Sequence, residues 1–141
     1  MSNVYARNRK TTDLAFLMIG QDLQAKLTIY VMNEKRVPKK WRYMVGRNII
    51  AKVDELVDNI VAANSIYPTT AEELEKRKLF QSLAICNCYQ LQNKIIRLIN
   101  CINTVTVDSL TQIIKLLHQE IATLKKWKKA SKLMDKSSVV C

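Results

Sequence analysis

Apolar side chains recur every three or four residues along most of this chain, which is the period of an amphipathic helix. The first such segment runs from about Asp13 to Glu34. Its inward stripe consists of Phe16, Ile19, Leu23, Leu27 and Tyr30. This spacing predicts one long helix near the start of the chain.

The same period returns after a basic connector that contains Pro38. Proline disfavours helical geometry in the residue before it and fits the first turn of a helix. We therefore predict a second helix that starts near Pro38 and continues to about Asn64. Its inward positions are Ile49, Val53, Leu56 and Ile60.

Two further helices follow, each with its own start signal. Thr70 and Glu73 have the spacing of a capping box, and the helical pattern then continues to about Ile102. The inward positions of this third helix are Phe80, Ala84, Leu91, Ile95, Leu98 and Ile102. We expect Asp108 to cap the fourth helix. The inward face of the fourth helix consists of Leu110, Ile113, Ile114, Leu117, Ile121 and Leu124.

Four helices joined by short loops favour a bundle in which neighbouring helices run in opposite directions. The chain has only two glycines and two prolines, whereas β architectures need many of both at their turns. We therefore predict an all-α fold, an antiparallel up-and-down four-helix bundle over residues 12–131. In this prediction residues 1–11 form a flexible basic N-terminus, and residues 132–141 form a frayed C-terminal tail.

The first and third predicted helices carry a second line of apolar residues, beyond what one bundle core needs. This line consists of Leu14, Met18, Ile29, Met32, Leu79 and Leu83. Exposed apolar patches of this kind mark interfaces. We expect a homo-oligomer or a tight hetero-partner, and a cyclic oligomer would gather the basic surfaces of its subunits into a ring.

The net charge makes the predicted bundle suited to polyanions. Lys and Arg number 23 against 12 Asp and Glu, a formal net charge of +11. Nucleic acid is the commonest partner of such a chain, an anionic membrane surface is the rival, and a basic domain with no polyanionic partner is the third possibility. No apolar stretch reaches the ~18 residues of a membrane span, and no signal-peptide cleavage site follows the short apolar run after Asp13. We expect a cytoplasmic protein with no membrane partner.

The cations gather in clusters along the sequence. Six of them, with no acid between, lie from Lys35 to Arg47, and Trp41 and Tyr43 offer planes there on which bases can stack. The candidate nucleic-acid-binding residues are Arg36, Lys39, Lys40, Arg42, Arg47, Lys94, Arg97, Lys125, Lys126, Lys128 and Lys129. No motif that reads base edges is present, so we expect recognition of shape and backbone. The alternative is that these clusters only solvate loops and helix ends.

The sequence argues against an enzyme, a cofactor and a metal site. His118 is the only histidine, and Gly20 and Gly46 stand alone within predicted helices, so there is no glycine-rich phosphate loop. The cysteines lack the spaced pairs of a zinc or disulfide framework, so we expect reduced thiols. Glu120 lies on the flank of an apolar stripe, where an unpaired charge is costly. We expect it to pair with a cation of a neighbouring helix or subunit.

Three stretches of the sequence carry a resemblance to a known family. They are Val37–Ile49, which combines proline, basic, aromatic and glycine residues, Glu72–Lys78, and Glu120–Lys128. Together they resemble the accessory variability determinants of diversity-generating retroelements (Avd-like proteins), over about Thr12 to Lys132. The resemblance implies a four-helix bundle assembled as a homopentamer. It also implies a non-catalytic partner of the retroelement reverse transcriptase and of template RNA or cDNA, which supports mutagenic cDNA synthesis.

Two other interpretations stay open. A sister group, encoded in intervening sequences of ribosomal RNA genes, shares the bundle. Its usual asparagine-isoleucine-alanine-glutamate-glycine stretch is absent here, where the sequence from Ile50 to Asp54 stands instead, and this departure favours the Avd-like family. The second interpretation is a generic basic interaction adaptor whose basic face meets an acidic protein or membrane.

Overall fold

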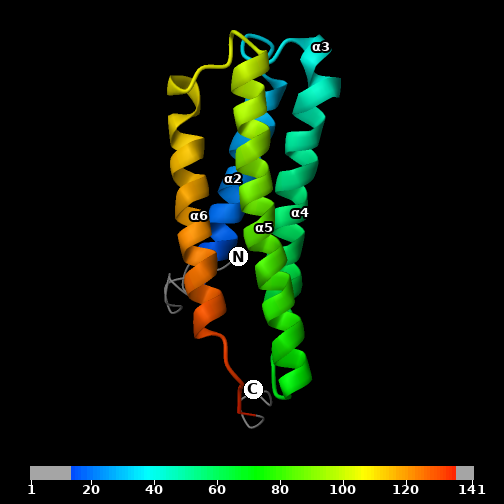
Figure 1. Ribbon diagram of the computed structural model, residues 1–141, viewed down its shortest axis with the longest axis vertical. Helices are drawn as coiled ribbons and strands as arrows, with labels where there is room; N and C mark the ends of the chain where they lie inside the picture. Colours follow the sequence, from blue (N-terminus) through cyan, green and yellow to red (C-terminus); the bar gives the residue numbers. More distant parts are fainter. Residues whose placement is uncertain (1–13, 136–141) are drawn as a thin grey trace, which may run out of the picture.

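The computed structural model describes residues 14–135, and residues 1–13 and 136–141 lie outside the described part. The predicted flexible N-terminus and the end of the predicted tail therefore fall outside it. Four long helices make up the described part: α2 Ala15–Met32, α4 Arg47–Asn64, α5 Ala71–Cys101 and α6 Thr111–Ala130 (Figure 1). Three short helical turns join them: α3 Lys39–Trp41, the π-helix η2 Arg42–Gly46 and the 3₁₀ helix η3 Asp108–Leu110. No strand occurs between residues 14 and 135, which confirms an all-α fold for this part.

The four long helices lie side by side and enclose one apolar core (Figure 1). Helices α4 and α6 each pack against both α2 and α5. The predicted inward stripe of α4 is fully buried, and in α2 only Ile19 of the predicted stripe is half-buried instead. The apolar periodicity therefore located the core faces of both helices. Within the described residues, no helix is long and apolar enough to cross a membrane.

The core face of α5 contains polar residues that the apolar pattern did not predict. Gln81 and Asn87 are buried, whereas Phe80, which was predicted to point inward, is half-buried. Gln81 Nε2 donates to Ser131 Oγ at 2.8 Å, and Asn87 Nδ2 donates to Glu55. These hydrogen bonds offset part of the cost of burying an amide, and Gln81 Oε1 has no hydrogen-bond partner among the described residues. Apolar periodicity alone therefore does not predict which residues of this part of α5 face the core.

The first turn of α5 confirms the predicted capping box. The Thr70 hydroxyl accepts from the backbone N–H of Glu73 at 3.1 Å, and Glu73 Oε1 accepts from the backbone N–H of Thr70 at 3.1 Å. Hydrogen bonds from Thr69 and Thr70 lower the pKa of Glu73 below its ordinary value. The box satisfies amides that have no partner inside the helix, and so fixes where α5 begins.

The predicted cap of the last helix at Asp108 is wrong. Asp108 opens η3, and α6 begins at Thr111 without a side-chain cap. Two hydroxyl residues bond one another's backbone at this turn instead: the N–H of Ser109 donates to Thr106 Oγ1 at 3.2 Å, and the N–H of Thr106 donates to Ser109 Oγ at 3.3 Å. The Ser–Thr pair holds the turn, which leaves the Asp108 side chain exposed.

The entry to α4 is a continuous helical path from Lys39 that passes through the π-helix η2. Pro38 precedes the first turn, as predicted. Gly46 ends η2 against α2, where an added Cβ would lie only 2.7 Å from Val31 Cγ1. The missing side chain therefore lets the start of α4 approach the end of α2 more closely than any other residue would allow.

The chain leaves α6 after Ala130 and continues without regular structure to the end of the described part. Ser131 is buried against α5, and the N–H of Met134 donates to the carbonyl of Pro68 at 2.7 Å. This segment therefore contacts α5 through Ser131 and the loop that joins α4 and α5 through Met134.

The second apolar line is largely solvent-exposed in the single chain. Ile29 is 71% exposed, and Leu14 is the only half-buried member. The exposed members are Met18, Ile29, Met32, Leu79 and Leu83. They come from α2 and α5, so both helices present apolar side chains to solvent as well as to the core.

Candidate nucleic-acid interface

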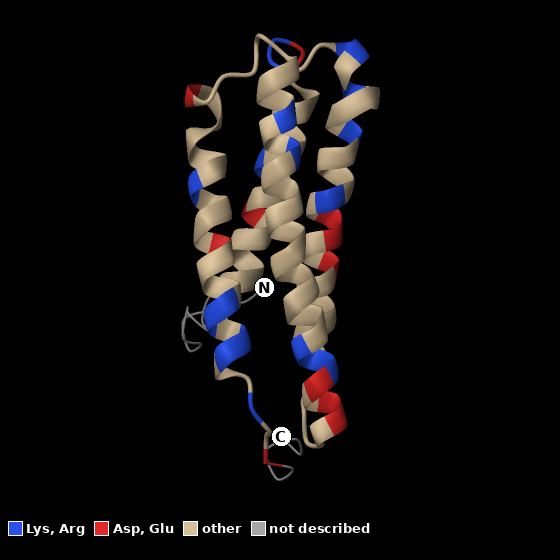
Figure 2. Cartoon of the chain, in the orientation of Figure 1, with Lys and Arg blue, Asp and Glu red and all other residues tan. Residues whose placement is uncertain are grey.

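The candidate cations lie in two regions of the bundle and do not form one surface (Figure 2). The first region, which we call the connector cluster, surrounds the entry to α4 and consists of Arg36, Lys39, Lys40, Arg42 and Arg47. The second, the α6 lysines, lies toward the opposite end and consists of Lys125, Lys126, Lys128 and Lys129. Lys94 and Arg97 lie in the last third of α5, and Lys94 lines a hollow with Lys52 and Tyr89, so these two cations lie between the two regions.

Two arginines of the connector cluster already bond to the chain itself. Arg36 Nη1 donates to the carbonyl of Thr104 at 3.1 Å, and Arg42 Nη2 donates to the carbonyl of Met32 at 3.1 Å. Arg42 Nη2 also lies 3.8 Å from Glu34 Oε1. Met32 is the last residue of α2, where carbonyls lack helical partners. These two arginines therefore stabilise the chain around the connector, and fewer of their N–H donors are free to bind a ligand.

The other members of the connector cluster face solvent. Lys39, Lys40 and Arg47 are exposed, and no ion pair to any residue between 14 and 135 involves them. Trp41 is half-buried against the core, whereas Tyr43 is 73% exposed. Of the two aromatic planes that the sequence offered here, Tyr43 is therefore the accessible one.

The α6 lysines bring in an aromatic residue that the sequence analysis missed. Lys125 Nζ donates to the hydroxyl of Tyr89 at 2.7 Å and lies 5.3 Å from the centroid of its ring. Tyr89 is exposed on α5. The sequence does place Tyr89 beside a cation, because Lys78 and Tyr89 are about three helical turns apart and so share one face of α5. Lys78 and Lys128 line the same shallow hollow between α5 and α6.

Trp127, which the α6 lysines surround in sequence, is engaged inside the chain. Its ring stacks on Phe16, with the ring centroids 3.7 Å apart and the planes 5° from parallel. Arg77 Cζ lies 5.2 Å from the same ring, and Arg77 Nη1 donates to the carbonyl of Ile66 at 2.9 Å. Trp127, near the end of α6, therefore contacts the start of α2 and the start of α5, and it is not placed to stack on a base.

The outer face of α4 sets a limit to the basic surface. Its acidic residues follow the connector cluster along the helix (Figure 2). Asp54 Oδ1 accepts from Gln24 Nε2 at 2.8 Å, and Glu55 Oε1 accepts from Lys52 Nζ at 3.3 Å. These carboxylates repel phosphates. A polyanion on the connector cluster is therefore not expected to continue along this face.

The expected ion pair of Glu120 is wrong. Its side chain is fully buried in the bundle, and neither carboxyl oxygen has a hydrogen-bond partner among the described residues. Oε2 lies so close to α2 that a Cβ added at Gly20 would be 2.9 Å from it. Burial raises the pKa of Glu120 to about 8, and burial together with this carboxyl raises the pKa of the Cys88 thiol. Because the carboxyl is enclosed in its own subunit, a neighbouring subunit could not reach it without opening the core.

Comparison of the chain with protein-family models, with curated proteins and with solved structures found no match.

Proposed function

We propose that this protein is an Avd-like accessory subunit of a diversity-generating retroelement, which binds the reverse transcriptase and template RNA or cDNA. The observation that carries the proposal is the group of exposed cations Lys39, Lys40 and Arg47 at one end of an all-helical bundle. The resemblance of Val37–Ile49 to that family falls on the same structural feature, the connector and the entry to α4. The protein has no catalytic role of its own in this proposal, and it acts in the cytoplasm.

The proposed mechanism is electrostatic capture followed by scaffolding. Each phosphate that a lysine or arginine neutralises releases condensed counterions, which favours binding at low salt. Lys39, Lys40 and Arg47 are available for this because they face solvent without an ion-pair partner in the described chain. Capture in this way fixes the position of the nucleic acid without reading its sequence.

The proposed assembly is a cyclic homopentamer of antiparallel up-and-down bundles. The exposed apolar residues of α2 and α5 support an interface, because single chains rarely leave such lines exposed to water. A ring would bring the connector clusters of five subunits onto one rim, and a multivalent rim binds a polyanion more tightly than one subunit does. The reverse transcriptase would meet the remaining apolar surface.

Salt-dependent RNA binding tests the electrostatic part of the proposal. The test variant carries Lys39→Glu, Lys40→Glu and Arg47→Glu. The charge-matched control carries Lys76→Glu, Lys115→Glu and Lys132→Glu, three exposed positions outside the connector cluster. For single-stranded RNA, we expect the test variant to reduce the slope of log K against log salt by roughly 2, about 0.7 for each phosphate that is no longer neutralised. An equal effect in both variants would refute a site confined to the connector cluster.

Co-purification from the native host tests the accessory role. Recovery of a reverse transcriptase with one discrete RNA is the expected result. Recovery of ribosomal RNA would point to the intervening-sequence group instead. An acidic protein recovered without nucleic acid would point to the adaptor function.

A further inference from the structure

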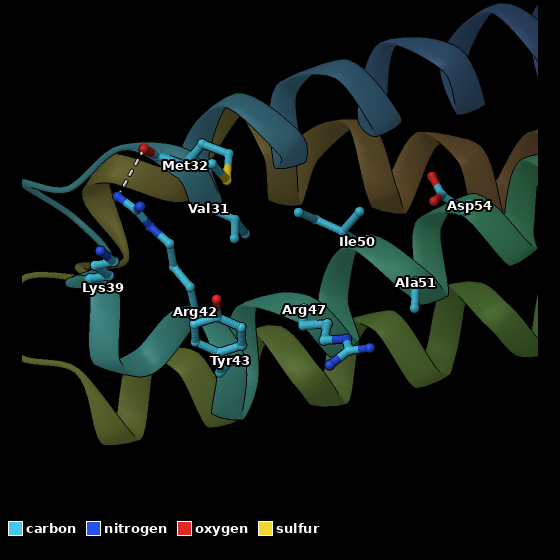
Figure 3. A pocket seen from close by; sticks show the side chains of 9 residues that line it. All are labelled: Val31, Met32, Lys39, Arg42, Tyr43, Arg47, Ile50, Ala51 and Asp54. Atoms are coloured by element: carbon cyan, nitrogen blue, oxygen red, sulfur yellow. Dashed lines mark hydrogen bonds between the residues drawn. The ribbon is translucent and has the colours of Figure 1, made fainter.

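A groove opens where the end of α2 meets the start of α4, and its volume is about 450 Å³. This lies within the roughly 300–1,000 Å³ of small-ligand sites. Its lining residues are Val31, Met32, Lys39, Arg42, Tyr43, Arg47, Ile50, Ala51 and Asp54 (Figure 3). The groove therefore occupies the middle of the connector cluster, although apolar side chains form much of its wall.

The two kinds of lining residue occupy different parts of the groove. Val31 belongs to the buried core, Ile50 is partly buried against that core, and together they form an apolar wall. Arg42, Tyr43 and Arg47 project from η2 and the first turn of α4 along the other side (Figure 3). The ring of Tyr43 is thus an accessible aromatic plane beside an apolar wall, with cations on either side of it.

Local backbone structure produces this arrangement. A π-helix adds a residue to one turn, and such turns are frequent at functional sites. Here the π-helix is η2, Arg42–Gly46, and Gly46 lets it approach Val31 of α2. The hydrogen bond from Arg42 to the carbonyl of Met32 then holds η2 against the end of α2. The groove is therefore held in place without a ligand.

We propose that this groove takes one unpaired nucleotide of a single strand, with its base against Tyr43 and the apolar wall and its phosphates on Lys39 and Arg47. The inference rests on the proposed nucleic-acid binding and adds the class of ligand. A phosphate alone would leave the apolar wall unused. A duplex keeps its base faces stacked on one another, so it cannot present a base to Tyr43.

Charge gives the bound strand a direction in the groove. Lys39 and Arg42 lie toward one end and Asp54 lies toward the other (Figure 3). Asp54 accepts a hydrogen bond from Gln24 at 2.8 Å, which holds the carboxylate in place. The sugar–phosphate backbone therefore runs from Lys39 to Arg47 and stops short of Asp54, and the base points toward the apolar wall at Ile50 (Figure 3).

The test compares a short labelled single-stranded RNA with its blunt-ended duplex by fluorescence anisotropy. Tyr43→Leu removes the aromatic plane, and Ala51→Phe fills the groove without a change in charge. Tyr67→Leu and Ala122→Phe are the matched controls, at positions outside the groove. We expect Tyr43→Leu and Ala51→Phe to weaken single-strand binding by about 5- to 100-fold and to leave duplex binding unchanged. The salt slope should stay at its wild-type value in both, because the cations that bind phosphate are unchanged.

A photo-crosslink gives a second, independent readout. RNA that contains 4-thiouridine should attach to the peptide that includes Tyr43 in the wild-type protein, and not in Ala51→Phe. Circular dichroism of each variant confirms that the helices are intact.

The outcomes separate this inference from the broader proposal. If the wild-type protein binds neither RNA, both fail. If it binds both RNAs and Tyr43→Leu behaves like Tyr67→Leu, only the nucleotide site is wrong. An equal loss of single-strand and duplex binding would assign Tyr43 to the general cationic surface and overturn the nucleotide site. Polyglutamate binding that is lost in Tyr43→Leu to the same extent would overturn the inference in favour of an acidic protein partner.

Discussion

Replacement of Glu120 by glutamine should abolish a pH dependence of stability that the wild-type protein shows from about pH 4.5 to 8. The carboxyl is fully buried without a hydrogen-bond partner among the described residues, and burial raises its pKa from 4.5 to about 8. In the unfolded chain the group returns to its ordinary pKa. Between these two values the folded protein holds a proton that the unfolded chain releases.

The sign and size follow from that proton. Since the folded state binds more protons, the free energy of unfolding falls as the pH rises, by about 1.4 kcal/mol per pH unit. The decrease ends near pH 8, where the folded carboxyl itself ionises. Over the whole window it amounts to at most about 5 kcal/mol, a large fraction of the roughly 5–15 kcal/mol that stabilises a typical domain.

Urea unfolding followed by circular dichroism, at fixed protein concentration between pH 5 and 9, measures this effect. Glu120→Gln keeps the shape of the side chain and cannot ionise, so its stability should be nearly constant over the window. The free energy of unfolding of Glu120→Gln should be close to the wild-type value near pH 5 and higher than that value near pH 9. Glu75→Gln, at an exposed position of α5, is the control and should keep the wild-type slope. A flat wild-type profile, or a slope that survives in Glu120→Gln, would refute the reasoning.

Three further predictions concern the bundle and its assembly. Thr70→Ala should lower the free energy of unfolding by roughly 0.5–2 kcal/mol in thermal melts, because it removes the capping box, whereas Thr123→Ala in mid-helix should change little. Gly46→Ala should lower the free energy of unfolding by roughly 1–3 kcal/mol, despite the better helix propensity of alanine, because the new Cβ meets Val31. Adding Val31→Ala should restore part of that stability, and purely additive effects of the two substitutions would contradict this contact. Ile29→Glu should reduce the mass of the assembly in light scattering, and Ile96→Glu, a matched exposed position on α5, should not.

The sequence predicted the fold well where one physical signal dominates. The inward stripe of α4 and the capping box of α5 follow from apolar periodicity and from one local hydrogen-bond pattern. The prediction failed where two patterns compete or where the partner is distant in sequence. A hydroxyl pair next to Asp108 holds the turn that Asp108 was expected to cap, and Gln81 is buried because Ser131, fifty residues later, supplies its partner. Neither interaction is visible in a helical period.

The candidate site was predicted as a set of cations, and the structure divides that set by role. Arg36 bonds to a loop carbonyl after α5 and Arg42 bonds to the last carbonyl of α2, and neither partner could be predicted from the sequence. Tyr89 shares a helical face with Lys78, but its contact with Lys125 joins two helices and could not be predicted from the sequence. The groove beside Tyr43 depends on the π-helix, which has no sequence signature of its own.

The distribution of acids indicates which face a long polyanion would follow between the two basic regions. On the face of α4, the carboxylates of Asp54 and Glu55 come after the connector cluster and repel a polyanion. On the other side, α5 carries no acid from Lys76 to its end, and the only acid of α6 is the buried Glu120. The faces of α5 and α6 therefore present no exposed carboxylate over that length. If the protein binds nucleic acid as proposed, the strand should leave the connector cluster along α5, pass Tyr89 and reach the α6 lysines, because this described face joins the two regions without crossing negative charge.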